Sequence, residues 1–391
     1  MDKLKLSIIR RLYFAGAQSI AEISSAVGKS VPNITASINQ LVEANIVVQN
    51  GLAPSTGGRR AASFVLNAEA LPSILSVAVD QYYTSVVVLD FANKPRTEIM
   101  TENIRLAEHD AFAKICALIS KAMEHVKKDS VFMIALTIPG FVDSLEGINN
   151  SFAIDTPLYN IGGNIEKEFE LPTFVENDST AIAIAEYNFG QGKDAKDVMV
   201  VNLNWGVGLG MIIDGDLYRG HSGYAGEFSH IPLSNMSKLC SCGKKGCLEV
   251  EASLIAARDS ANEMLASGEE SVLQSSYAKK GFITGDELLE ASEGGDQLAI
   301  KAVRRIGYML GKGIATLIHI INPEKVVISG RGAKAKRVLL PEIQSALLEF
   351  AIPRLSKNTK IEFSEITDIQ LLGSCCVAVG NMDKTIMKAI N

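Results

Sequence analysis

The chain has 391 residues, which is too many for one ordinary hydrophobic core, so we expect a small domain and a larger two-lobed body. Hydrophobic residues at 47% and charged residues at 21% describe a globular protein, and no apolar run reaches the roughly 20 residues of a membrane span. The net charge of −6 argues against a protein that coats nucleic acid along its whole surface. The N-terminus lacks the pattern of a secretion signal, so we expect a cytoplasmic protein without a membrane partner.

Charge is distributed unevenly along the chain. Seven cationic and three anionic side chains lie in the first 67 residues, whereas the rest of the chain is acidic. A basic head on an acidic body indicates that only the head contacts phosphates.

The head begins with three predicted helices. Apolar residues at helical spacing predict a first helix that ends at Gly16. Ser19 and Glu22 have capping-box spacing, which predicts the start of a second helix that ends at Gly28. Ser30 is expected to cap a third helix. Its predicted core face consists of Ile34, Ile38, Leu41 and Val42.

Two short strand-like runs, 46–49 and 62–66, flank a Gly-Gly-Arg-Arg tip and predict a wing. Three helices followed by a wing are typical of a winged helix-turn-helix that binds operator DNA, and a small protein-interaction domain is the alternative. The third helix has no Arg or Lys after Lys29, so an Asn reading adenine, or apolar contact with thymine, remains available. The expected DNA contacts are Ser30, Asn33, Thr35, Arg59 and Arg60.

Beyond the head, the pattern predicts an α/β body. Runs 74–80 and 85–90 are rich in β-branched residues and predict buried strands, a helix is expected over 111–127, and a further strand over 131–138. Asp178 then follows a predicted strand and precedes a helical run. It is equally consistent with a catalytic base and with a helix N-cap.

The strongest local signal is a cluster of three cysteines and a histidine. His230, Cys240, Cys242 and Cys247 form the ligand set of a closed tetrahedral zinc site, which would be structural because no position remains for water. A redox-active cysteine cluster is the alternative. Cys116, Cys375 and Cys376 lie in apolar surroundings and are expected to pack in the core. A glycine-rich hairpin over 200–213 is only a weak phosphate-binding signal.

Several of these segments together resemble the ROK family of repressors and sugar kinases. The similar segments are 139–143, 176–178, 206–208, 226–230 and 240–249. The head, with its Gly-Arg wing, resembles that of ROK repressors of the xylose and N-acetylglucosamine type, whereas ROK kinases generally lack such a head.

The resemblance implies an actin-like (ribonuclease H-like) two-lobed fold with an N-terminal winged helix-turn-helix domain. The implied domains are a DNA-binding domain at 1–70, a first lobe at 71–190 plus 376–391, and a second lobe with the zinc loop at 191–375. A sugar would lie between the lobes, with His230 binding zinc through one ring nitrogen and facing the sugar with the other. The implied sugar-binding residues are Gly140, Asn177, Asp178, Glu227, His230 and Glu249. Asp178 would occupy the position of the kinase base.

The phosphate-binding segments depart from the kinase pattern. ROK kinases have Asp-x-Gly-Gly-Thr where this chain has Tyr82 and Tyr83 in place of the two glycines, and these side chains disfavour positive φ. Asn204 and Trp205 replace a second small pair, although the run 326–332 resembles the family's adenosine-side turn. We therefore expect a non-catalytic regulator, a repressor, that responds to a monosaccharide or sugar phosphate and acts as a homodimer or homotetramer. An ATP-dependent sugar kinase with an accessory head is the alternative.

Overall fold

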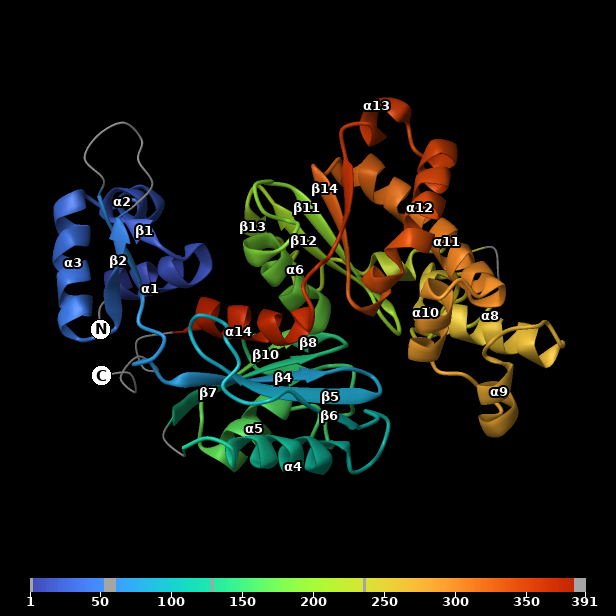
Figure 1. Cartoon of the computed structure of the whole chain (residues 1–391), viewed down its shortest axis with the longest axis horizontal. Coiled ribbons are helices and arrows are strands. Elements are labelled where there is room, and N and C mark those ends of the chain that lie inside the picture. Colours follow the sequence, from blue (N-terminus) through green and yellow to red (C-terminus); the bar gives the residue numbers. More distant parts are fainter. Residues whose placement is uncertain (1–2, 53–60, 128–129, 235–236, 383–391) are drawn as a thin grey trace. The chain divides into compact units, whose positions relative to one another are not determined.

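The computed structural model describes residues 3–52, 61–127, 130–234 and 237–382 (Figure 1). The chain forms two compact units, Met1–Ala181 with Gln370–Asn391, and Ile182–Ile369. Each unit has its own five-stranded sheet. The three-domain division expected from the sequence, with the head separate from the first lobe, remains a prediction.

The head has the element order that the sequence predicts. Its elements are α1 (Lys3–Ala15), β1 (Gln18–Ser19), α2 (Ile20–Val27), α3 (Val31–Glu43), β2 (Val47–Leu52) and β3 (Ala62–Leu66). The strands pair antiparallel in the order β1-β3-β2. Arg59 and Arg60 lie outside the described residues, between β2 and β3.

Local sequence signals explain the ends of these helices. The Ser19 and Glu22 capping box forms as predicted, and Gly28 ends α2 in the left-handed conformation with φ 65°. Ser30 occupies the N-cap position of α3, but its side chain makes no capping hydrogen bond, so the predicted cap is only positional. The predicted core face is wrong at Val42, which is 41% exposed, because the buried face of α3 includes Ser37 and is rotated away from Val42.

The sheet of the first unit runs in the order β10-β7-β4-β5-β6, with β10, β7 and β4 parallel and β5 and β6 antiparallel to their neighbours. Its elements are β4 (Ser73–Val79), β5 (Tyr83–Leu89), β6 (Met100–Asn103), α4 (Ala111–Met123), β7 (Val131–Ile138), β8 (Val142–Asp143), β9 (Ile148–Asn149), α5 (Ile161–Phe169), β10 (Thr173–Asn177) and α14 (Ile369–Asn381). The helix predicted over 111–127 is shorter than expected, since α4 ends at Met123. The predicted strand over 131–138 is confirmed.

Alternating side chains of β4 point to opposite faces of this sheet. Leu75 and Val77 belong to the core that also includes α4 and α5, whereas Ser76 between them contacts α14. Figure 1 shows α4 and α5 on one face of the sheet and α14 on the other. The sheet is therefore covered on both faces, which explains why β4 and β7 are buried along their whole length.

The second unit has a sheet in the order β13-β12-β11-β14-β15. Its strands are β11 (Val198–Leu203), β12 (Val207–Ile213), β13 (Asp216–Leu217), β14 (Lys325–Ser329) and β15 (Lys360–Phe363). Its helices are α7 (Glu249–Ala252), α8 (Leu254–Ala266), α9 (Gln274–Lys280), α10 (Gly285–Glu293), α11 (Gln297–Ile321), α12 (Lys336–Phe350) and α13 (Pro353–Ser356), with the 3-10 segments η2 (Phe228–His230) and η3 (Arg331–Ala335). Helix α6 (Asp178–Phe189) contains the boundary between the units.

The expected glycine-rich hairpin forms from β11 and β12, which pair antiparallel up to Leu203 and Val207. In the described ranges, none of the helices has the length and apolar character that a bilayer crossing requires.

Candidate metal centre and neighbouring polar groups

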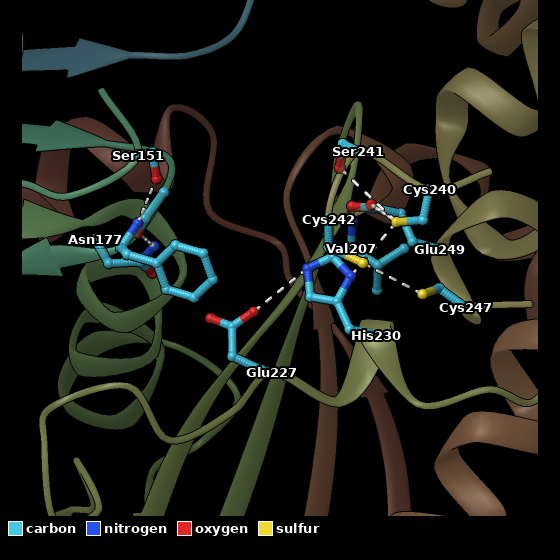
Figure 2. A network of polar contacts seen from close by, with 12 residues as sticks. Ser151, Asn177, Val207, Glu227, His230, Cys240, Ser241, Cys242, Cys247 and Glu249 are labelled. Atoms are coloured by element: carbon cyan, nitrogen blue, oxygen red, sulfur yellow. Dashed lines mark hydrogen bonds and ion pairs between the residues drawn. The ribbon is translucent and has the colours of Figure 1, made fainter. Parts of the chain in front are cut away.

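The second unit brings the four predicted metal ligands together. One ligand atom from each of His230, Cys240, Cys242 and Cys247 lies within 4.8 Å of all the others. Figure 2 shows the four side chains converging from η2 and the following loop. The sequence therefore predicted the membership of this cluster correctly.

The distances within the cluster fit a tetrahedral ion. Cys242 Sγ and Cys247 Sγ are 3.6 Å apart, and Cys240 Sγ is 3.5 Å from His230 Nδ1. Two sulfur atoms bound to zinc at about 2.3 Å with tetrahedral angles are separated by about 3.8 Å, so the Cys242 and Cys247 sulfur atoms need little movement to bind one ion. Three sulfur atoms and one imidazole form a donor set that favours zinc.

Two carboxylates border this cluster. Glu227 Oε2 is 3.5 Å from His230 Nε2, the ring nitrogen on the opposite side from Cys240. Desolvation raises the pKa of the Glu227 carboxyl; the nearby His230 opposes this shift and Glu249 adds to it. Because 46% of the Glu227 side chain stays exposed, the carboxyl remains accessible to a polar ligand.

Glu249 begins α7 and contacts both the cluster and the glycine-rich hairpin. Its Oε2 accepts from Cys240 Sγ at 3.4 Å, and its Oε1 accepts from Val207 N at 3.4 Å. Gly206 makes this approach possible, since a Cβ there would lie 2.6 Å from Glu249 Oε1. A zinc-bound thiolate has no proton to donate, so metal binding would release Glu249 Oε2 for another donor.

The first unit holds the other predicted sugar-binding residues. Asn177 Nδ2 donates to Gly140 O at 3.0 Å, and Asn177 Oδ1 accepts from Ser179 N at 2.9 Å and Thr180 N at 3.1 Å. Asn177 is thus the N-cap of α6, and it also orients the Gly140 loop. The alternative in which Asp178 caps this helix is wrong, because Asp178 is already the first residue of α6.

Asp178 nevertheless lies next to that cap. Its side chain is largely buried, and its Oδ1 accepts from Ser179 N at 2.8 Å and Ser179 Oγ at 3.2 Å. These bonds hold the Asp178 carboxyl group in one orientation.

Residues that the sequence did not single out shape the Gly140 turn. Gly140 has φ 111°, and an added Cβ would lie 2.9 Å from Asn149 Oδ1 and overlap Ser151 Oγ. The same Ser151 hydroxyl accepts from Phe141 N at 2.8 Å, a contact drawn in Figure 2. Asn149 Nδ2 donates to Pro139 O at 3.0 Å. A signal for these roles was present in the Asn-Asn-Ser run at 149–151, which is typical of turns.

The segment 80–84 corresponds to the first phosphate-binding hairpin of ROK kinases. Here the Asp80 side chain accepts hydrogen bonds from the backbone of its own turn. Asp80 Oδ1 accepts from Tyr82 N at 2.6 Å and from Tyr83 N at 2.7 Å. Neither tyrosine has a positive φ, as their side chains predict. Two backbone amides of this turn are therefore engaged within the chain.

Trp205 lies in the second segment that departs from the kinase pattern, and its ring is tightly packed. It is 4% exposed, the Arg331 guanidinium lies 5.2 Å from its ring centroid, and Arg331 also pairs with Asp286 at 3.0 Å. A Cβ at Gly285 would overlap the same ring. The sequence predicted the substitution at Trp205 but not its contact with Arg331, which depends on packing of η3 against the hairpin.

In the head, α3 presents Asn33 to solvent, and Ser30 is also exposed. Thr35 is half-buried, and its hydroxyl donates to Val31 O at 2.8 Å within the helix. Asn39 and Gln40 are exposed on the same helix and were not singled out from the sequence. Among the other cysteines, Cys375 and Cys376 are buried as predicted, whereas Cys116 is only partly buried.

These two units and the head define a protein with the actin-like α/β fold of sugar kinases, carrying an N-terminal winged helix-turn-helix domain. A model of the ROK family matches residues 89–374, and the chain belongs to this family.

Known relatives include both regulators and kinases. The chain is 29% identical to the N-acetylglucosamine repressor of Escherichia coli O6:H1 over 360 residues, which cover 91% of this chain and 86% of the relative. A crystal structure of a ROK family transcriptional regulator, a homologue of the Escherichia coli MLC protein, matches with a TM-score of 0.77 and 26% identity over 100% of this chain and 99% of that one. A ROK family glucokinase from Streptomyces griseus, solved with glucose and AMPPNP, matches with a TM-score of 0.67 and 25% identity over 77% of this chain and 97% of that one.

Proposed function

We propose that the protein is a carbohydrate-responsive transcriptional repressor. The observation that carries this proposal is the combination, in one chain, of a winged-helix head with a sugar-kinase body whose phosphate-loop amides are bound by Asp80. The full-length similarity to a ROK transcriptional regulator supports it. The head binds operator DNA, and the body binds the effector.

The effector is a monosaccharide or sugar phosphate. Glu227 and Glu249 supply carboxylate acceptors near the His230 ring, and carboxylates that accept from ring hydroxyls give both affinity and orientation. Gly140, Asn177 and Asp178 in the other unit remain predicted contacts of the same ligand. Binding of an effector requires no phosphoryl transfer to the sugar.

Structural zinc is part of the proposal. The ion would be held by His230, Cys240, Cys242 and Cys247, and would fix the loop that precedes Glu249. Bound through Nδ1, it would also set the His230 tautomer, so that Nε2 carries a proton to donate to a ligand oxygen.

Sugar binding is expected to release DNA by a population shift between two arrangements of the protein. The repressor would act as a homodimer or homotetramer, because helix-turn-helix proteins bind paired half-sites. Sedimentation analysis at micromolar concentration tests this, and a monomer on DNA would contradict it.

The central test first selects the DNA sequence that the protein binds and then measures whether a sugar weakens that binding. The full chain is used to select duplexes from a random library, and the selected duplex is titrated with N-acetylglucosamine, glucose, xylose and their phosphates. We expect nanomolar binding that one member of the panel weakens at least tenfold. Failure to enrich any sequence would overturn the proposed function.

A sugar kinase is the second candidate, because the family includes glucokinases and the resemblance to them would place Asp178 in the position of the kinase base. The same sugar panel with MgATP should release no ADP, since the Asp80 turn and Trp205 oppose nucleotide binding. ADP release that disappears in Asp178→Asn would establish the kinase instead.

A further inference from the structure

Helix α14 is buried on nearly every side within the first unit. Leu371, Cys375, Val377, Ala378 and Val379 are each less than 5% exposed. A helix that is apolar all round is an internal element, and thirteen residues span about 20 Å. Its two ends therefore contact parts of the unit that are well separated.

The first end of α14 is bound to the ends of two strands. Gln370 Nε2 donates to Val79 O at 2.9 Å and to Thr137 Oγ1 at 3.1 Å. Val79 is the last residue of β4, directly before the Asp80 turn. Thr137 lies three residues before Gly140, whose carbonyl accepts from Asn177.

Next to Gln370, the helix is fastened to β4 by hydroxyl groups. Ser76 Oγ donates to Leu371 O at 2.8 Å and lies 2.7 Å from Ser374 Oγ. All three residues are largely or completely buried. The helix and the strand are therefore expected to move together.

The other end of α14 is held by the DNA-binding head. Arg10 of α1 donates from Nε to Val379 O at 3.3 Å and from Nη2 to Met382 O. The last carbonyls of a helix lack intrahelical partners and carry partial negative charge, so a guanidinium is a favourable partner for them.

A second contact from α1 lies one turn later. Tyr13 OH donates to Asn93 Oδ1 at 2.6 Å, and its ring packs edge-on against Phe91 with centroids 6.2 Å apart. Tyr13 is 4% exposed, so this contact is part of a buried, packed interface.

Building on the proposed function, we propose that α14 transmits the state of the predicted sugar-binding strand ends to the DNA-binding head, with Gln370 and Arg10 as positioning residues at its two ends. A ligand on Asn177 and Gly140 moves the end of β7, and Gln370 passes this movement to a rigid helix. The hydrogen bonds of Arg10 to its carbonyl partners then change, which alters how firmly the head is held.

The first experiment needs no ligand. Hydrogen exchange is measured on the full chain with Gln370→Leu, which keeps the side-chain size and removes both hydrogen bonds. We expect peptides of α1 to exchange at least about threefold faster, while peptides of β11 in the other unit, which report general stability, are unchanged. Equal exchange of α1 in the variant and the parent protein would overturn the proposal.

The matched control is Gly380→Ala, which changes α14 next to the Arg10 contacts at a position where an added Cβ meets nothing within 4 Å. Exchange of α1 should stay as in the parent. A similar acceleration in Gly380→Ala would show that any change in α14 loosens the head, which also contradicts the specific role of Gln370.

The second experiment measures sugar-induced release of the selected DNA in Arg10→Met and Arg10→Lys. We expect the ratio of dissociation constants with and without sugar to approach one in Arg10→Met, with the thermal shift by the same sugar retained, and to recover partly in Arg10→Lys. If both variants respond like the parent protein, the relay is wrong and the proposed function stands. If no sugar releases DNA from the parent protein, the proposed function fails and the exchange experiment alone decides the relay.

Discussion

His230 places Nδ1 3.5 Å from the Cys240 sulfur and Nε2 3.5 Å from the Glu227 carboxylate. One imidazole thus joins the predicted metal centre to the predicted effector site. Any change in metal occupancy should therefore alter both the stability of the loop and the response to sugar.

Replacement of one sulfur ligand should remove the metal. Cys247→Ser is expected to lose stoichiometric zinc and to lower the melting temperature, because binding free energy at a structural site is also folding free energy. Zinc is measured by atomic absorption on protein purified without chelator. Cys116→Ser, a cysteine outside the cluster, is the control and should keep one zinc per chain. Retention of one zinc per chain in Cys247→Ser would show that the cluster is not the metal site.

The charge on Glu249 should matter for the effector and not for DNA. Glu249→Gln is expected to weaken sugar binding about 10- to 100-fold, since hydrogen bonds to a charged group contribute about 1.5–3 kcal/mol. Titration calorimetry with the releasing sugar checks this, and DNA affinity without sugar should be unchanged. Glu290→Gln, on an exposed position of α10, serves as the control. Unaltered sugar affinity in Glu249→Gln would remove this residue from the site.

Residues of the head that contact bases should affect DNA binding differently from those that contact phosphates. Asn33→Ala is expected to cost about 1–3 kcal/mol at the selected duplex and to relax the preference at one base position, because Asn pairs with adenine through two hydrogen bonds. Competition with single-base variants of the duplex provides the measurement. A uniform loss over all variants would show that Asn33 contacts the backbone.

The wing arginines should behave in the opposite way. Arg59→Ala with Arg60→Ala is expected to weaken binding to all duplexes alike and to reduce the slope of log affinity against log salt by about two, since each arginine is expected to neutralise one phosphate. Fluorescence anisotropy between low and moderate salt checks this. An unchanged slope would place both arginines away from the phosphates.

The Gly140 turn should tolerate no side chain. Gly140→Ala is expected to destabilise the protein by about 1–3 kcal/mol, since it combines a strained positive φ with overlap at Ser151 Oγ. Gly268→Ala shares the positive φ, but its Cβ would meet nothing within 4 Å, so the difference between the two variants isolates the overlap. Urea unfolding gives both values, and equal losses of stability would show that the overlap is relieved without cost.

Local signals in the sequence predicted much of the architecture. The Ser19 and Glu22 capping box, the strand over 131–138 and the metal-binding spacing from His230 to Cys247 each depend on residues that are close in the chain. Their chemistry needs little help from distant segments, so spacing alone was sufficient. The prediction for Val42 was wrong, and the N-cap alternative for Asp178 did not hold, because helix rotation and the first residue of a helix depend on neighbours in space.

By itself, then, the sequence determined the order of elements, the likeness to the ROK family and the membership of the metal cluster. Only the tertiary structure decided that Asn177 orients the Gly140 loop, that Arg331 covers Trp205, and that Arg10 caps the far end of α14. Arg10 and Val379 are separated by most of the chain. Such contacts depend on how buried helices and sheets pack against one another, and no local pattern of residues encodes that packing.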